Sequence, residues 1–202
     1  MIGRVGILDS AHRALPLDAG EFLDGETRTP GFLAMNPAGQ VPVMKLDDGR
    51  PLAQSNAIVL YLAEGTPIVP ADPYDHARML EWMFLEQYSH EPYVAVRRFQ
   101  RPYLGRPDNE IDPRLMERGT AALARMEAHL RDHSWLVGDG LSAADLCLLP
   151  YTALAPEGGF NLTDYPKVQG WIARTNAGLG LDVLSGSTPA GEESWKGKRM
   201  IS

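Results

Sequence analysis

Cysteine is nearly absent from this sequence, and its scarcity excludes one class of protein. The 202 residues include a single cysteine, Cys147, so an intrachain disulfide cannot form. A disulfide-stabilised secreted domain is therefore excluded, and we expect the reducing compartment of the cytoplasm. Because Cys147 lies among leucines at 146, 148 and 149, we expect a small apolar residue in a buried helix rather than a reactive thiol.

Long apolar runs and clusters of basic residues are lacking as well. No apolar stretch approaches the roughly 20 residues of a membrane span, and residues 1–6 do not resemble the start of a signal peptide. The formal net charge is −7 and the isoelectric point about 5.2, so we expect neither a membrane nor a nucleic-acid partner. Apolar residues make up 44% of the chain, which is enough to form a core.

The first third of the chain shows a mixture of strand and helix signals. Residues 41–46 and 51–53 flank Asp47-Asp48-Gly49, and an Asp-Gly pair between apolar runs predicts a β-hairpin because glycine accepts the positive φ of the turn. We expect helices over residues 29–35 and 56–64, the second followed by Gly65 in the usual position of a C-terminal cap. The Pro-rich residues 65–71 predict a linker.

The remainder of the chain carries helix signals only. Asp72-Pro73 and Asp112-Pro113 are typical helix starts, and the first of these helices should kink or end near Pro92. Ser142 and Asp145 form a capping-box pattern before a segment that is apolar nearly all round, which predicts the central buried helix. Tyr165-Pro166 opens a last helix. The sequence therefore predicts an α/β domain over residues 1–65, an all-α domain over 72–178 and a C-terminal tail over 179–202.

Three segments together resemble the glutathione S-transferase family. They are Asn36–Val43 with Gln54–Ile58 after the hairpin, Glu86–Tyr93 on the first long helix, and Val137–Asp145 before the core helix. They occur in the family's order and spacing, and the resemblance extends from about residue 24 to residue 177. It implies a thioredoxin-like N-terminal domain, an all-helical C-terminal domain, and glutathione as substrate or ligand.

The resemblance implies a glutathione-binding role for four residues. In the family, the residue before a cis-proline bonds the extended tripeptide through its main chain, and here Val41 precedes Pro42. Ser55 is expected at a helix N-cap, where free N–H groups favour the γ-glutamyl carboxylate. Gln54 stands where the family commonly has glutamate, so binding should be weaker by about 1 kcal/mol. A trans proline in a turn and a plain N-cap are the alternatives for Pro42 and Ser55.

The segment before residue 24 looks too short for a complete first βα unit. A crossover connection takes at least about 10 residues, whereas only four residues separate Asp9 from Ala14. In the family, the loop after the first strand carries a Ser, Tyr or Cys that activates the glutathione sulfur. Ser10 lies at about this place, and a serine in a short polar loop is the alternative. We therefore expect an incomplete unit with weak catalytic power.

Two functions from different classes follow from the resemblance. The first is a transferase that conjugates glutathione to an apolar electrophile, with Tyr88, Tyr93 and Phe99 as candidate lining of the acceptor site. The alternative is a non-catalytic glutathione-binding or interaction protein that has lost its sulfur-activating residue. Both are compatible with the features at Val41–Pro42 and Gln54–Ser55.

Two further expectations concern assembly and metal binding. Because members of the family form dimers, we expect a homodimer with two-fold symmetry, and the helix that carries Trp82 and Phe84 should lie near the dimer interface. His129 and His133 are four residues apart on one helix, which is a spacing that can hold a metal. No third ligand is evident, so we expect no metal cofactor.

Overall fold

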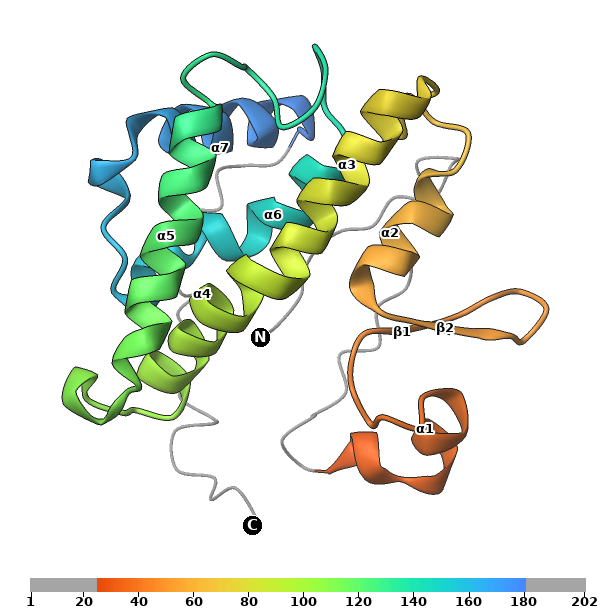
Figure 1. The fold of residues 1–202 in the computed structure, drawn as a ribbon. Helices are drawn as coiled ribbons and strands as arrows, with labels where there is room; N and C mark the ends of the chain where they lie inside the picture. The colour runs from red at the N-terminus through yellow and green to blue at the C-terminus, as the bar shows by residue number, and fades with distance from the viewer. Residues whose placement is uncertain (1–24, 181–202) are drawn as a thin grey trace. The chain divides into compact units, whose positions relative to one another are not determined.

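A computed structural model of the protein describes residues 25–180. The chain divides into a first unit that ends at Thr66 and a second that begins at Pro67 (Figure 1). The expected first βα unit lies outside the described residues, as does the tail after Gly180. Within residues 25–180, no helix is long and apolar enough to cross a membrane.

The first unit contains a two-stranded antiparallel sheet. β1 (Val43–Lys45) pairs with β2 (Pro51–Ala53), and Val43 lies opposite Ala53. The turn is closed by a hydrogen bond of 2.9 Å from the Leu46 amide to the Arg50 carbonyl, and Gly49 has the positive φ that the turn requires, 88°. The predicted hairpin is confirmed, although its first strand begins at Val43 rather than Val41.

Helical segments flank this hairpin on both sides in the sequence. The Thr29 side chain accepts the Phe32 amide and so caps the first α-helix, whose first residue is Pro30. The last helix of the unit ends before Gly65, which has a φ of 74°. The segments are η2 (Glu26–Arg28), α1 (Pro30–Met35) and α2 (Ser55–Ala63).

The second unit begins with a long helical path. In it, α3 (Pro73–Leu85) is followed by the π-helical turn η3 (Glu86–His90), by α4 (Glu91–Arg98) and by a second π-helical turn, η4 (Phe99–Tyr103). We predicted that the helix would kink or end near Pro92, but a π turn precedes the proline and the helical path continues. In the wider π turn, the Glu91 amide donates to the Glu86 carbonyl. Pro92 then lies in the first turn of α4, where a backbone N–H has no partner within the helix, so the proline removes no helical hydrogen bond.

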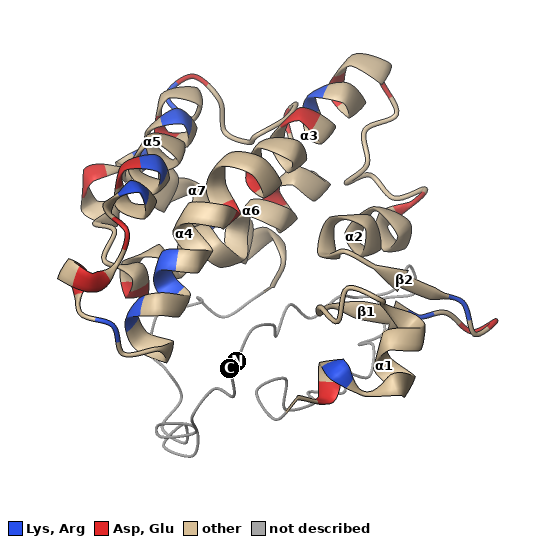
Figure 2. Cartoon of the chain, turned by 60° about the horizontal axis from the view of Figure 1, so that its bottom comes forward, with Lys and Arg blue, Asp and Glu red and all other residues tan. Residues whose placement is uncertain are grey.

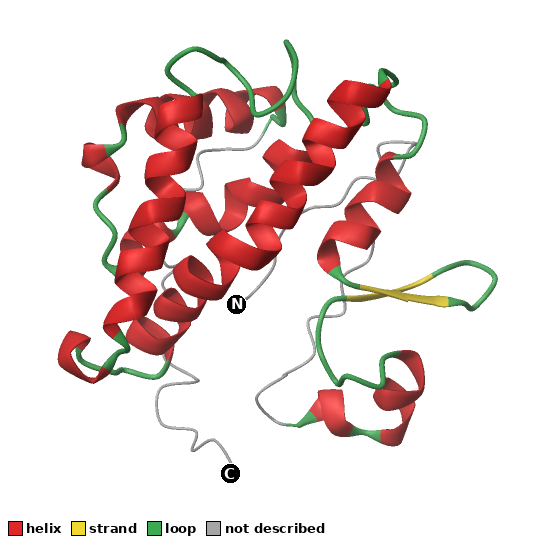
Figure 3. Ribbon diagram, viewed as in Figure 1, coloured by secondary structure: helices red, strands yellow, loops and turns green. Residues whose placement is uncertain are grey.

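The rest of the second unit is also helical (Figure 3). The predicted starts at Asp72-Pro73, Asp112-Pro113 and Tyr165-Pro166 are confirmed. Asp72 shows why such starts can be recognised, because its Oδ1 accepts the amides of Tyr74 and Asp75, both at 3.0 Å. The segments are η5 (Asp108–Glu110), α5 (Pro113–His129), α6 (Ala143–Ala153), η6 (Ala155–Gly158), η7 (Leu162–Asp164) and α7 (Pro166–Gly178).

Helix α6 forms the centre of this unit, as predicted, with most of its residues buried. The fully buried Asp145 carboxylate accepts the Ser142 amide at 2.9 Å and the Ser142 hydroxyl at 2.7 Å. It also accepts the Leu136 amide at 3.2 Å and the Trp171 Nε1 at 2.7 Å. The predicted capping box is confirmed, and Asp145 additionally joins the start of α6 to the preceding loop and to α7.

Figure 2 marks where charged residues lie along the chain, and some of them connect further elements of the second unit. Arg98 lies within α4 and is buried, and its Nε donates to Glu157 of η6 at 2.6 Å. Its neighbour Arg97 donates to Asp108 of η5 at 2.9 Å. Glu127 of α5 accepts the Val168 amide at 3.0 Å, which caps α7. Each of these buried charged groups has a hydrogen-bond partner on another element, and the bonds link the elements of the unit.

Candidate functional site

The peptide bond between Val41 and Pro42 is cis. This confirms the expectation that the family resemblance gave and excludes the trans alternative. Val41 is 46% exposed, and among residues 25–180 its main-chain N–H and C=O have no hydrogen-bond partner. An accessible and unengaged main chain beside a strand is what an extended peptide ligand can pair with.

The second part of the candidate site is the start of α2. Gln54 has φ 75° and ψ 118°, a conformation that a residue other than glycine rarely adopts and that is enriched at ligand sites. Our prediction that Ser55 is the N-cap is wrong, because Gln54 is the N-cap and Ser55 is the first helical residue. The Gln54 side chain makes no capping hydrogen bond, and the positive end of a helix favours an anionic group.

The sheet register brings these two parts together. Val43 lies opposite Ala53, so Val41, two residues before β1, and Ser55, two residues after β2, flank the same end of the hairpin. Pro42 and Gln54 lie beside them in the chain. All four residues that the sequence suggested for glutathione are therefore gathered at one end of one hairpin, whereas Ser10 lies outside the described residues.

The three aromatic residues suggested for an acceptor site occupy different positions on the second unit. Tyr88 belongs to the π turn η3 and is 84% exposed. Tyr93 lies in α4 and is half-buried. Phe99 stacks on Tyr103 with ring centroids 5.9 Å apart. Tyr88 and Phe84 thus present apolar surface on this helical path, whereas Trp82 is buried within the unit.

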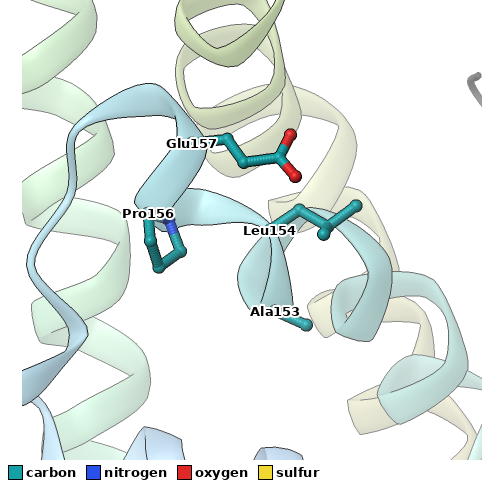
Figure 4. A pocket seen from close by; sticks show the side chains of 4 residues that line it. All are labelled: Ala153, Leu154, Pro156 and Glu157. Atoms are coloured by element: carbon teal, nitrogen blue, oxygen red, sulfur yellow. The ribbon is translucent and has the colours of Figure 1, made fainter. Parts of the chain in front are cut away.

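A cavity of about 300 Å³ lies at the C-terminal end of α6 (Figure 4). Its described lining consists of three apolar residues, Ala153, Leu154 and Pro156, and the carboxylate of Glu157. That carboxylate already accepts the Arg98 Nε, so the cavity offers an apolar wall and a largely compensated charge. Sequence analysis missed this cavity because its residues form no recognisable motif.

Two other features that the sequence raised are structural. Cys147 is buried, as predicted, and burial raises the pKa of its thiol well above the usual range, which disfavours the reactive thiolate. The rings of His129 and His133 stack with centroids 4.2 Å apart. His129 Nε2 donates to the Trp135 carbonyl at 3.1 Å, and His133 Nδ1 donates to the His129 carbonyl at 2.9 Å. Within residues 25–180, no three potential ligand side chains are grouped to hold a metal.

Comparisons with known proteins match both halves of the chain to one family. The family model of the glutathione S-transferase N-terminal domain matches residues 11–64, and that of the C-terminal domain matches residues 75–178. Maleylacetoacetate isomerase of Rhizobium meliloti is 31% identical over 193 residues, which cover 92% of this chain and 87% of the relative.

Solved structures agree with these matches. A glutathione S-transferase from Pseudomonas fluorescens has a TM-score of 0.74 and 44% identity, over 78% of this chain and 79% of that one. A possible glutathione S-transferase from Rhodopseudomonas palustris has a TM-score of 0.77 and 38% identity, over 91% of this chain and 90% of that one. The fold is therefore a thioredoxin-like N-terminal domain followed by an all-helical domain, as the sequence predicted.

Proposed function

Because the chain belongs to the glutathione S-transferase family, we propose that it binds glutathione and joins the tripeptide's sulfur to an apolar electrophile. One observation carries the proposal. The exposed main chain of Val41, which has no hydrogen-bond partner within residues 25–180, lies at the same hairpin end as the start of α2, where the Gln54 side chain makes no capping hydrogen bond.

Each group at this end of the hairpin matches a part of glutathione. The Val41 N–H and C=O pair with the extended main chain of the tripeptide. The first turn of α2, with the Ser55 hydroxyl, receives the γ-glutamyl carboxylate. The amide oxygen of Gln54 accepts the γ-glutamyl ammonium, without the charge that a glutamate would add. Binding in the micromolar to millimolar range is expected.

Replacement of Ser55 by alanine tests the binding mode. Loss of a hydrogen bond to a charged group should weaken glutathione binding by about 1–2 kcal/mol in isothermal titration calorimetry. Thr66→Ala is the matched control, because its hydroxyl bonds the Ala63 carbonyl at the opposite end of α2. Equal affinities in Ser55→Ala and the unsubstituted protein would overturn the assignment.

Conjugation additionally requires a group that stabilises the thiolate, and Ser10 is our candidate. The alternative is a non-catalytic glutathione-binding or interaction protein. We expect slow conjugation of a chloronitrobenzene substrate, because the lack of a donor locked near the sulfur typically lowers the rate by about 10²–10³. Ser10→Ala should then change the rate little. A fast reaction that collapses in Ser10→Ala would show instead that Ser10 activates the sulfur.

Isomerisation is a second candidate reaction at the same site. It is favoured by the maleylacetoacetate isomerases among the relatives, one of them matched over 92% of this chain. The thiolate would add to a carbon–carbon double bond, the resulting single bond would rotate, and elimination would restore the thiolate and the double bond. Glutathione is consumed in conjugation but not in isomerisation, so its stoichiometry separates the two.

We also propose that two copies of the chain form a homodimer in the cytoplasm. Phe84 is 69% exposed on α3, so it remains a candidate residue of the dimer interface. Trp82 is buried and belongs to the core of the helical unit. The single cysteine is compatible with a reducing compartment.

A further inference from the structure

The loop that leads from α1 to Pro42 is folded around the side chain of Asn36. This side chain is only 7% exposed. Its Oδ1 accepts the Ala38 amide at 3.2 Å, and its Nδ2 donates to the Gln40 carbonyl at 2.7 Å. The Asn36 carbonyl accepts the Gly39 amide at 2.9 Å. One orientation of the carboxamide satisfies both a donor and an acceptor of the loop, so its conformation is fixed.

The opposite side of the loop is held by η2. The Arg28 Nη1 donates to the Ala38 carbonyl at 3.4 Å. Gly39 has a φ of 63°, and a Cβ there would lie 2.5 Å from Arg28 Nη1 and 3.1 Å from the Thr27 carbonyl oxygen. The loop therefore packs closely on η2 at Gly39, where a side chain has no space.

Together these contacts determine which main-chain groups remain for a ligand. The amides of Ala38 and Gly39 and the carbonyls of Ala38 and Gln40 are all engaged within the loop or by Arg28. Val41 follows directly, exposed and, within residues 25–180, without a main-chain partner. The carboxamide of Asn36 thus sets the direction in which the Val41 N–H and C=O point.

We propose that Asn36 is a positioning residue for glutathione, a conclusion that rests on the proposed function. It does not touch the ligand but orders the loop before the ligand arrives. A preformed loop does not have to be ordered during binding, and this raises affinity without any added contact. Removal of the carboxamide would leave the Ala38 amide and the Gln40 carbonyl unpaired and the Val41 main chain free to turn.

The experiment compares three variants by calorimetric titration with glutathione and by thermal unfolding. Asn36→Ala removes both side-chain hydrogen bonds, and we expect about tenfold weaker binding. Asn36→Asp keeps the acceptor for Ala38 but turns a carboxylate oxygen toward the Gln40 carbonyl. It should also bind weakly at pH 7.5, and its affinity relative to the unsubstituted protein should recover as the pH falls toward about 4, near the ordinary pKa of an aspartate, where a protonated carboxyl can donate.

Thr29→Ala serves as the matched control in the same unit. It removes the cap of α1, where the hydroxyl accepts the Phe32 amide, and the hydrogen bond of 2.9 Å from that hydroxyl to the Glu26 carbonyl, and so lowers stability without removing a hydrogen bond of residues 36–41. We expect its glutathione affinity to stay within about twofold of the unsubstituted protein, because both lost bonds lie outside the loop. Loss of affinity in the Asn36 variants but not in Thr29→Ala supports a positioning role that a loss of stability does not explain.

The outcomes distinguish this inference from the proposed function. Unchanged affinity in both Asn36 variants, with binding by the unsubstituted protein, overturns the positioning role alone. Equal losses in Thr29→Ala and the Asn36 variants also overturn it, because stability then explains the effect. No binding by the unsubstituted protein overturns the proposed function and, with it, the positioning role.

Discussion

The imidazole of His90 is fully buried, and its replacement should change how stability depends on pH. Its Nε2 lies 3.0 Å from the Thr152 hydroxyl, which donates its one proton to the Leu148 carbonyl at 2.7 Å. The imidazole must therefore donate through Nε2 and carry no proton on Nδ1. Among the described residues, Nδ1 has no hydrogen-bond partner, so protonation there would place a charge in a site that offers it no acceptor.

The size of the effect follows from the displaced pKa. Burial lowers the pKa of His90 from an ordinary value of 6.5 to about 4. The unfolded chain takes up a proton below pH 6.5, whereas the folded chain does so only near pH 4. Stability is therefore fully present above pH 6.5 and is lost as the pH falls through this interval. At about 1.4 kcal/mol per pH unit, the loss by pH 4 is about 3 kcal/mol.

Urea unfolding at several pH values between 7.5 and 4 tests this reasoning. His90→Gln retains a donor near the Thr152 hydroxyl but has no group that titrates, so its free energy of unfolding should fall about 3 kcal/mol less over the interval than that of the unsubstituted protein. Thr152→Val is the control, because it removes the hydrogen bond and keeps the imidazole, and its pH dependence should stay steep. Parallel curves for His90→Gln and the unsubstituted protein would refute the argument.

Two further predictions concern packing and assembly. A Cβ at Gly119 would lie 2.4 Å from the Phe160 ring, so Gly119→Ala should lower stability by about 2–3 kcal/mol. A Cβ at Gly170 would meet no atom of residues 25–180 within 4 Å, so Gly170→Ala should raise stability by about 0.5–1 kcal/mol. Thermal unfolding of both variants measures this, and shifts of the same sign would contradict it. In light scattering we expect twice the chain mass of 22.2 kDa, and Phe84→Ser should shift the protein toward the monomer. A single-chain mass at high concentration would exclude the dimer.

Local signals account for the parts of the fold that the sequence predicted well. A helix start depends on a side chain and on the amides two or three residues after it, as at Asp72, so a short window of sequence contains all the information. The π turn before Pro92 could not be predicted in this way. It depends on how the proline fits into a helix whose other residues, including Glu86 and His90, are buried against the rest of the unit.

The candidate site was predictable to a different degree in each of its parts. Its residues were identified from a resemblance, since composition and spacing alone favour a trans bond at Pro42. The N-cap of α2 is Gln54, one residue before the predicted Ser55, because Gln54 adopts a φ of 75°. This main-chain conformation cannot be inferred from the residue type. The loop contacts of Asn36 could not be predicted, because they depend on the path of the chain from 36 to 41.

The structure also bears on whether glutathione binding and catalysis depend on each other. The groups that we propose for binding are held by contacts within residues 25–66. Asn36 folds the loop, the β1–β2 ladder fixes the hairpin, and the Ile58 amide bonds the Gln54 carbonyl at 3.0 Å. Ser10, our candidate for activating the sulfur, comes from a different segment.

A group that acts only on the developing thiolate changes kcat, whereas a group that holds the tripeptide equally in ground and transition states changes KM. Changes at Asn36 and Ser55 should therefore appear mainly in KM for glutathione, whereas whatever small effect Ser10→Ala has should appear in kcat, so that binding can persist in a chain whose catalytic group is weak.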